Sequence, residues 1–369
     1  MKKITVSHKD LNTFCKKILI RSGIPENDAV IASNVLIEAD LRGYSSHGVA
    51  RLPVYLELIE NGRINKSPLV HESKRTKNKA VGNVNGDNGL GLIVAHRSME
   101  IAIKKAKSHG IGCVAVSHSN HYGIAQYASL MATKKNMVGI SMTNTSACVS
   151  HNNGKGRLLG TNPMAITLPY KNKPFISDFS SPVVSYGKLQ IAQFENKNIP
   201  DGWAIDSNGN NSNDPYIIEK SGTLLPLGSD LGHSDYKGMC LGVSIDALCS
   251  LLSGAAFLSF VPHFVAISSH IKNLDENISS RGSGHFFIAI DIDAFREYKD
   301  YQKDIEVFIN TIKSTEPRNK SDKVYYPGEI DHLNRKKHIK NGIPIYHEIL
   351  KNLDLIGKKF DLDLINKMP

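Results

Sequence analysis

The chain has 369 residues, which is enough for two or more sub-domains around a substantial core. Hydrophobic residues make up 41% of it, an ordinary share for a globular protein. No apolar run approaches the ~20 residues that cross a bilayer. The five cysteines are scattered and form no C-x-x-C pair, which speaks against a disulfide framework and favours a reducing cytoplasm. The charged N-terminal residues are not followed by the apolar segment that a signal peptide has, so we expect no signal peptide and no membrane partner.

The net charge of +10 raises a second function class, a basic protein that binds DNA or RNA. The lysines are spread along the chain, and the densest basic clusters, at 74–79 and 335–340, have no interleaved aromatic residues. We therefore favour a solvated basic surface and no nucleic-acid partner. A positive cleft would also suit an anionic substrate or the phosphates of a cofactor.

The first part of the chain predicts helices. Ser7 can cap a first helix, which breaks at 23–25, and a second helix begins near Glu26. A third helix runs from near Val49 to Ile59 and stops at Asn61-Gly62, a typical C-terminal signal. Residues 7–65 show almost no strand pattern, so we expect a helical region.

From residue 79 the pattern alternates between strands and helices, which is typical of an α/β fold. Strands at 80–84 and 112–116 flank an amphipathic helix at 92–108, a βαβ-like unit. The remaining expected strands lie at 137–142, 165–168, 174–178 and 286–292. The remaining expected helices lie at 124–135, 237–258 and 294–314, with two more after the turn at 326–329. A polar stretch at 201–214 is expected to be a surface excursion.

Two loops carry candidate acid/base groups. His47 lies at a helix boundary beside Ser46, and His121 directly follows an expected buried strand. Arg51 follows His47 by four residues and suits a planar carboxylate. The alternative for His47 is an ordinary loop histidine beside a capping serine, and for His121 a packed core histidine. The residues alone leave both alternatives open.

Two further positions suit a cofactor. Asp178 ends an apolar strand and could hold a ribose hydroxyl, or simply cap a turn. Lys237 opens a helix and could meet a phosphate, although an exposed first-turn lysine is the simpler interpretation. No G-x-G-x-x-G follows an expected strand, and no Walker A, H-E-x-x-H or G-x-S-x-G motif occurs, so neither a Rossmann site nor a metal site is expected.

Several of these loops, in this order, resemble the malate/L-lactate dehydrogenase family that is unrelated to the Rossmann lactate dehydrogenases. Its members include ureidoglycolate and sulfolactate dehydrogenases, diketogulonate reductase and the piperideine-carboxylate reductases. The similarity covers nearly the whole chain, and its strongest segments are 40–64, 117–132, 158–166, 177–188, 202–204, 224–242 and 284–295.

The resemblance implies an α/β (α+β) fold that binds NAD or NADP without a Rossmann motif. It also implies a homodimer. It implies a mixed-sheet domain at 76–304 and a helical sub-domain formed by residues 1–75 together with 305–369. It also implies that His121 or His47 transfers the proton with Ser46 as relay, and that Arg51, Gly160 and Thr161 bind the substrate. The cofactor residues it implies are Thr145, Asp178, Phe179, Ser180, Tyr236, Lys237, Pro327, Gly328 and Glu329.

The sequence therefore predicts a cytoplasmic NAD(P)-dependent oxidoreductase that interconverts a small 2-hydroxy acid and its 2-oxo acid. Reduction of a cyclic imino acid, such as a piperideine or pyrroline carboxylate, needs the same carboxylate clamp and proton donor and remains an alternative. A basic nucleic-acid-binding protein remains the alternative from another class, and salt-sensitive binding without turnover would distinguish it.

Overall fold

The structure is a computed structural model that describes residues 3–229, 234–264 and 275–363. Its helices are α1 (His8–Arg21), α2 (Glu26–Arg42), α3 (Leu52–Glu60), α4 (Gly91–His109), α5 (Ala125–Thr133), α6 (Tyr186–Glu195), α7 (Asp235–Ser250), α8 (Glu276–Ser279), α9 (Tyr298–Lys313), α10 (Glu329–Asn341) and α11 (His347–Lys359). Short 3-10 helices lie at Val49–Arg51 (η1), Leu258–Phe260 (η3) and Ile292–Ala294 (η5). Its strands are β1 (Lys3–Val6), β2 (His71–Glu72), β3 (Val81–Asn85), β4 (Ile111–Ser119), β5 (Met137–Thr143), β6 (Val149–Ser150), β7 (Arg157–Leu159), β8 (Met164–Leu168), β9 (Phe175–Phe179), β10 (Ala204–Ile205), β11 (Thr223–Leu224), β12 (Ser283–Asp291) and β13 (Ile343–Tyr346).

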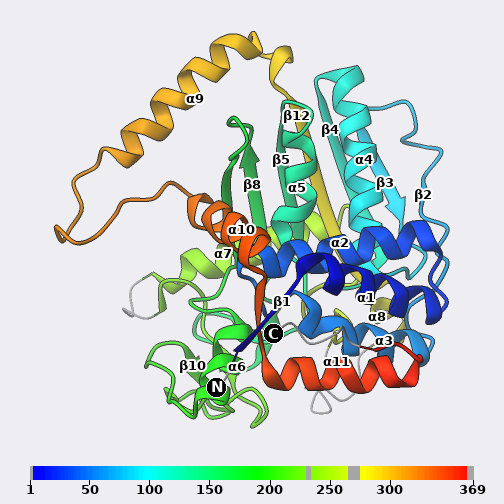
Figure 1. The fold of residues 1–369 in the computed structure, drawn as a ribbon, viewed down its shortest axis with the longest axis vertical. Helices are drawn as coiled ribbons and strands as arrows, with labels where there is room; N and C mark the ends of the chain where they lie inside the picture. The colour runs from blue at the N-terminus through cyan, green and yellow to red at the C-terminus, as the bar shows by residue number, and fades with distance from the viewer. Residues whose placement is uncertain (1–2, 230–233, 265–274, 364–369) are drawn as a thin grey trace.

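A seven-stranded sheet in the order β2-β3-β4-β12-β5-β8-β9 forms the centre of the molecule (Figure 1). Strands β3 and β4 are parallel and joined by α4, which confirms the predicted βαβ unit. The other neighbouring strands run antiparallel. The expected mixed-sheet α/β fold without a Rossmann arrangement is therefore confirmed.

Helices cover both faces of this sheet. Successive residues of β12 point to opposite faces, so Phe287 packs under α4 and α5 while Phe286 faces α7. Two glycines allow the helices to lie close to the strands: a Cβ on Gly112 would approach Ala102 O of α4 to 2.0 Å, and one on Gly139 would approach Ser129 O of α5 to 2.1 Å. Backbone contact at both places brings α4 and α5 close to the sheet near the starts of β4 and β5.

The two ends of the chain come together beside this sheet. Strand β1 pairs antiparallel with β13, with Lys3 opposite Tyr346, and one apolar cluster joins α1, α2 and α3 to β13 and α11. Ser7 caps α1 through the N–H of Asp10, as the sequence predicts. The pairing of β1 with β13 was not expected. A boundary between sub-domains at residues 75 and 305 remains a prediction.

A smaller sheet in the order β10-β11-β6-β7 packs with α6 around a second core. The predicted excursion at 201–214 contributes β10 to this sheet, and α6 was not expected. The helix predicted at 237–258 was too long, because α7 ends at Ser250. There the Ser250 and Ser253 hydroxyls bond back to the carbonyls of Asp246 and Cys249, and Gly254 takes a positive φ of 82°.

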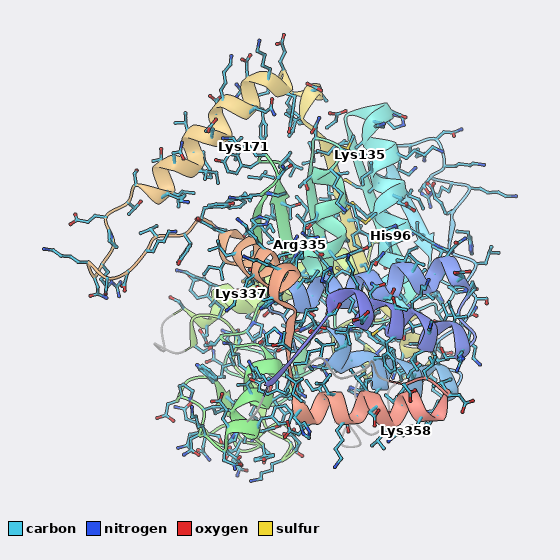
Figure 2. The ribbon with its side chains drawn as sticks, in the orientation of Figure 1. His96, Lys135, Lys171, Arg335, Lys337 and Lys358 are labelled. Atoms are coloured by element: carbon cyan, nitrogen blue, oxygen red, sulfur yellow. The ribbon has the colours of Figure 1, made fainter. Side chains whose placement is uncertain are left out.

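Charged side chains stand out from many elements of the surface (Figure 2). Lys135, Lys171, Lys337 and Lys358 are exposed and belong to four separate segments of the chain. This dispersed pattern agrees with the solvated surface expected from the sequence. None of the described helices is both long enough and apolar enough to cross a membrane.

Candidate active site

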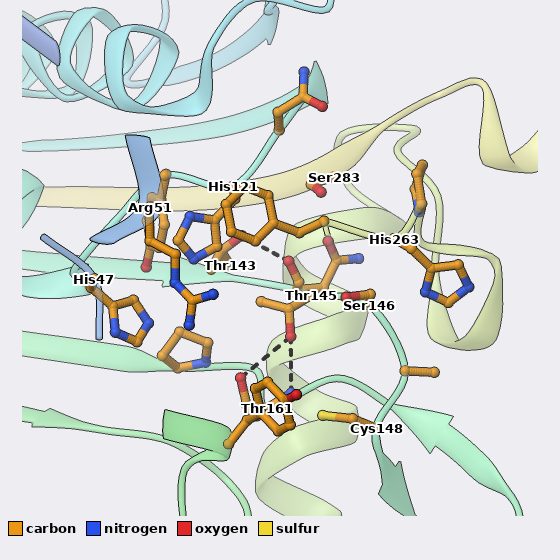
Figure 3. A pocket seen from close by; sticks show the side chains of 18 of the residues that line it. His47, Arg51, His121, Thr143, Thr145, Ser146, Cys148, Thr161, His263 and Ser283 are labelled. Atoms are coloured by element: carbon orange, nitrogen blue, oxygen red, sulfur yellow. Dashed lines mark hydrogen bonds between the residues drawn. The ribbon is translucent and has the colours of Figure 1, made fainter. Parts of the chain in front are cut away.

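One cavity of about 150 Å³ lies at the edge of the central sheet where β4 and β5 end and β12 begins. It brings together His47 and Arg51 from one segment with His121, Thr145 and Thr161 from three other loops (Figure 3). Five of the residues singled out from the sequence therefore share one site. The carboxyl ends of strands and the loops after them are common places for ligand sites in α/β folds.

A buried carboxylate stabilises the loop that carries His47. Asp40, on α2, accepts a hydrogen bond from Val49 N at 2.8 Å. A Cβ on Gly48 would come within 2.1 Å of that carboxylate, so only glycine fits between His47 and Val49. Ser46 Oγ lies 2.8 Å from His47 Nδ1, which fixes the ring orientation. The structure thus brings Ser46 and His47 together, and it adds Asp40, to which the sequence gave no role.

The His121 ring is fixed by α3 and by a second aromatic ring. Tyr55 Oη lies 2.7 Å from His121 Nδ1, and the Phe264 ring stacks on the imidazole at 4.1 Å between centroids. The His47 and His121 rings are themselves 5.6 Å apart and nearly stacked. Both histidines have a protein partner at Nδ1, which leaves Nε2 as the atom for chemistry in the cavity.

Arg51 lies between the His47 loop and α6. Its Nε donates to Ser46 O at 2.6 Å, and its Nη2 donates to Gln190 Oε1 at 3.0 Å. Its guanidinium also lies 5.9 Å from the centre of the Phe264 ring. Two anchored N–H groups hold the planar group in place, while its positive charge has no carboxylate partner among the described residues.

The electrostatics of the site keep both imidazoles neutral. Burial, and then the nearby Arg51 charge, lowers the pKa of His47 to about 4. Burial also holds the pKa of His121 well below its usual value, with further lowering by His47, Arg51 and His285. A neutral imidazole can accept a proton near pH 7, as a general base must.

Thr145 and Thr161 line the cavity, and Gly160 precedes Thr161 in the same loop. Thr145 Oγ1 accepts from Thr161 N at 2.9 Å, and a Cβ on Gly160 would meet Thr145 O at 2.2 Å. Asn162 Oδ1 accepts from Thr145 N at 3.0 Å and ties the same two loops together. Gly160 is therefore required for the close approach of the loops that hold the two threonines.

The other residues expected to bind a cofactor lie outside this cavity. Asp178 is the half-buried residue before the last of β9, accepts from Gln126 N at 3.2 Å, and has a pKa raised by burial to about 7. Pro327 O accepts from Ile176 N at 2.9 Å, so the turn with Gly328 and Glu329 docks on β9 beside Asp178. Glu329 pairs with Lys313 at 2.6 Å.

Phe179 and Ser180 continue from Asp178 toward α7, where Tyr236 and Lys237 are exposed in the first turn. Ser181 O accepts from Leu227 N, and Leu227 O accepts from Gly238 N, which joins the end of β9 to this helix. These expected cofactor residues therefore lie in one band along the end of β9, and Ser181 N donates to Thr161 O at the cavity wall, whereas Thr145 lies in the cavity itself.

Several residues at the site were missed from the sequence. Tyr55 follows Arg51 by four residues on a helix, and that spacing could have placed both on one face. Arg63, Arg157, His263 and Phe264 also line the cavity, but they come from segments with no common local pattern. Only the folded chain brings them together. No cluster of metal-ligating side chains occurs in the part of the chain that the structure describes.

Comparison with known proteins identifies the family of the chain. The model of the malate/L-lactate dehydrogenase family matches residues 6–354. The chain is 38% identical to a malate dehydrogenase of Pyrococcus horikoshii over 98% of its length and 96% of the relative. It is 36% identical to a malate/(S)-sulfolactate dehydrogenase of Methanothermus fervidus over 97% and 99%. The crystal structure of malate dehydrogenase from Entamoeba histolytica superposes with a TM-score of 0.89 at 29% identity, covering 98% and 99% of the two chains. The chain therefore belongs to the malate/L-lactate dehydrogenase family and is a hydroxy acid dehydrogenase.

Proposed function

We propose that this protein interconverts a small 2-hydroxy acid and its 2-oxo acid with NAD or NADP as hydride carrier. The observation that carries the proposal is the convergence of two neutral, half-buried histidines and one anchored arginine on a single cavity. A base for the hydroxyl proton and a cation for the carboxylate are the two groups that oxidation of such an acid requires.

One of the two histidines carries the proton. With Nδ1–H donated to Tyr55 Oη, the Nε2 atom of His121 is free to accept the hydroxyl proton of the substrate. His47 can do the same with Nδ1–H donated to Ser46 Oγ, which then acts as the relay to solvent. In the reverse direction the imidazolium returns the proton to the keto oxygen. The assignment to His121 uses its 2.7 Å hydrogen bond with Tyr55, and the assignment to His47 uses its 2.8 Å hydrogen bond with Ser46.

Arg51 holds the substrate carboxylate in this proposal, with Thr161 and the backbone at Gly160 beside it. Its remaining N–H groups are the donors available to a carboxylate, because Nε and one Nη2 hydrogen bond belong to Ser46 and Gln190. A carboxylate fixed there places the C2 hydroxyl of the substrate beside the imidazole that accepts its proton.

The band along β9 is the proposed cofactor site. The half-buried carboxylate of Asp178 suits a ribose hydroxyl, Lys237 at the start of α7 suits a phosphate, and Thr145 lines the cavity itself. Phe179, Ser180, Tyr236 and the turn of Pro327, Gly328 and Glu329 complete it. A nicotinamide bound there supplies the hydride acceptor for C2.

Transfer of an isotopic label tests the hydride step directly. L-malate with deuterium at C2 is incubated with the protein and NAD+ or NADP+, and the reduced nicotinamide is isolated. We expect deuterium at the nicotinamide ring, since hydride passes directly from C2. Deuterium released only into water would contradict the proposal. Absence of cofactor binding, measured by thermal shift and by fluorescence transfer to the reduced ring, would contradict the assigned cofactor.

A homodimer is also part of this proposal. Helix α9 lies at the edge of the molecule (Figure 1), where it packs Ile305 and Ile309 in one apolar cluster but leaves Val307 and Phe308 exposed by 65% and 52%. Apolar surface of this kind supports contact with a second copy. Light scattering that gives the mass of one chain at micromolar concentration would contradict it.

A further inference from the structure

A buried histidine that the proposed mechanism does not use lies close to the active site, inside the central sheet. His285 belongs to β12, which lies between β4 and β5 (Figure 1), and its side chain is buried. Strand β4 leads into the loop of His121, and β5 leads into the loop of Thr145. His285 therefore lies between the two strand ends that carry groups of the cavity.

The imidazole of His285 forms a hydrogen bond with each of these strand ends. Its Nε2 atom lies 2.7 Å from Ser119 Oγ, and its Nδ1 atom lies 2.7 Å from Thr143 Oγ1. Ser119 is the last residue of β4 and Thr143 the last residue of β5. Each lies two residues before a residue of the cavity, His121 or Thr145. One ring thus joins both strand ends across β12.

The donors and acceptors along this chain of bonds follow from the carbonyl groups beside it. Thr143 Oγ1 lies 2.9 Å from Gly284 O and 2.9 Å from Asn144 O, and since a carbonyl only accepts, the Thr143 hydroxyl donates there. Thr143 Oγ1 then accepts from Nδ1–H of His285, which leaves Nε2 to accept from the Ser119 hydroxyl. Burial lowers the pKa of His285 to about 3, so the ring keeps this neutral form with one donor and one acceptor.

The bond to Ser119 is formed where the backbone ladder between β4 and β12 is irregular. The pairing register leaves two residues of β4, 117–118, opposite Gly284 alone. This is a β-bulge, which leaves part of the ladder unpaired and redirects the bulged strand. His118, inside the bulge, has a φ of 53° and donates its N–H to a carbonyl outside β12. The His285 side chain therefore connects the two strands at a point where backbone pairing is interrupted.

The same ring also contacts the residue that follows His121. The Tyr122 ring stacks on the His285 imidazole, with centroids 4.9 Å apart and planes inclined by 5°. His285 therefore holds residues on both sides of His121, namely Ser119 and Tyr122. Tyr55 orients the His121 side chain, whereas His285 acts on the backbone that carries it.

We propose that His285 is a positioning residue of the dehydrogenase reaction, which fixes His121 and Thr145 relative to each other through its two ring nitrogens. It does not line the cavity itself, so it acts through the strand ends. Misplacement of a reacting group by about 1 Å can lower a rate by about 100-fold, which gives such a bridge a function beyond packing. This inference rests on the proposed function, since that function assigns proton transfer to His121 and cofactor binding to Thr145.

Two substitutions break one bond each. The asparagine amide reaches as far from the backbone as Nδ1 of histidine, and the glutamine amide reaches as far as Nε2. His285→Asn therefore keeps the bond to Thr143 and loses the bond to Ser119, and His285→Gln does the reverse. Thr167→Val is the matched control, because it removes a buried hydroxyl that bonds to Gly139 O at 3.3 Å in the same sheet, outside the cavity.

The kcat and the cofactor Kd distinguish the two strand ends, measured for reduction of oxaloacetate by NADH and by NADPH. We expect His285→Asn to lower kcat about 10-fold and to move its pH profile, with a cofactor Kd within about 2-fold of the wild type. We expect His285→Gln to raise the cofactor Kd about 10-fold, with a smaller change in kcat. Thr167→Val should lower the Tm and leave kcat, Kd and pH profile unchanged. Equal changes of kcat and Kd in both His285 variants, or no change in either, would overturn the proposal.

Crystal structures of the wild type and the variants test the bridge without turnover. We expect the backbone of His121 to shift from β12 by more than about 0.5 Å, the usual tolerance of an active site, in His285→Asn only, and that of Thr145 to do so in His285→Gln only. These shifts support the bridge even if no 2-oxo acid is reduced, which would contradict the proposed function alone. Unmoved backbones, or the same shift in both variants, would overturn it. If either variant fails to fold, Ser119→Ala and Thr143→Val break the same two bonds from their other ends.

Discussion

Tyr55 Oη and His121 Nδ1 lie 2.7 Å apart, and both side chains are buried. Burial raises the pKa of Tyr55 above its usual value, so its hydroxyl stays protonated and neutral at every pH at which the protein works. The hydrogen bond therefore orients the imidazole without adding charge to the site. In the proposed mechanism Tyr55 is a positioning residue that acts through His121.

Replacing Tyr55 by phenylalanine removes this hydrogen bond and keeps the ring that packs on Phe264. We expect kcat to fall roughly 10-fold, since one such bond contributes on the order of 1.4 kcal/mol. The pH at which the rate titrates should also move, because Nδ1 loses its partner. Tyr127→Phe, on α5 and outside the cavity, is the control. A lower rate with an unchanged pH profile would show that Tyr55 contributes only packing and does not orient His121.

Alanine at His121 and at His47 tests the proton carrier. Each substitution should lower kcat by roughly 10²–10⁴-fold, the usual effect of losing a positioned acid or base. Cofactor affinity should change little, because neither residue belongs to the band along β9. The true acid/base loses its titration together with its rate, whereas the helper loses rate but keeps a titration. Near-normal kcat in both folded variants would exclude a histidine mechanism.

The pH dependence of the two directions should be opposite. The pKa of His47 is about 4 and that of His121 is lowered well below its usual value, so both are neutral near pH 7 in the free protein. For oxidation, kcat/KM should rise as pH increases through the low pKa of the base and be level near neutrality, because only the neutral ring accepts a proton. For reduction it should fall as pH rises, because the donor must be protonated. Initial rates of oxidation and of reduction from pH 4 to pH 9, a span of about five units, test whether kcat/KM changes with pH in opposite directions.

Arg51→Lys should act mainly on substrate binding. Lysine keeps the positive charge but cannot hold both Ser46 O and Gln190 while it presents further N–H groups to a carboxylate. We expect a higher KM for the 2-oxo acid with a smaller change in kcat, if the contact is equally strong in the ground and transition states. Steady-state kinetics with each active acid measure this. Unchanged kinetics would remove Arg51 from the site.

Asp40→Asn should change the pH dependence of stability. Burial raises the folded-state pKa of Asp40 from 3.8 to about 7. The stability linked to this raised pKa is present below the unfolded-state pKa and is lost as pH rises through about 7. Asparagine does not titrate, so the free energy of unfolding of the variant relative to the wild type should improve steadily between pH 4 and pH 7, by at most about 1.4 kcal/mol for each step of one in pH. Urea unfolding at several pH values gives the difference. A constant difference would contradict the raised pKa.

Much of this site could be predicted from short stretches of sequence. The Ser46-His47-Gly48 turn, Arg51 four residues later, and His121 after a strand each have a local signal, and the structure brings these residues together in one cavity. Strands β3, β4, β5, β8 and β9 and helices α4 and α5 also followed from hydrophobic periodicity, because each is long enough to show it, whereas the short strands β6 and β7 were missed.

The missed features depend on contacts between distant segments. Strands β1 and β13 have four residues each and pair across almost the whole chain, so neither has a local pattern that predicts the other. Arg63, Arg157 and His263 come from three segments that only the folded chain brings to one cavity. The end of α7 at Ser250 depends on serine hydroxyls bonding back to the helix, which competes with the apolar pattern that continues beyond it.

The central claim is that this protein reduces a 2-oxo acid with a reduced nicotinamide and a buried histidine as proton donor. The most direct measurement is the initial rate of cofactor oxidation with a panel of 2-oxo acids and cyclic imino acids, each tested with NADH and NADPH, for the wild type and for the His47→Ala and His121→Ala variants. We predict turnover of at least one 2-oxo acid by the wild type and loss of that turnover in the variant that lacks the proton donor. Turnover of cyclic imines alone would assign the other reaction, and no turnover of any substrate with either cofactor would contradict the account.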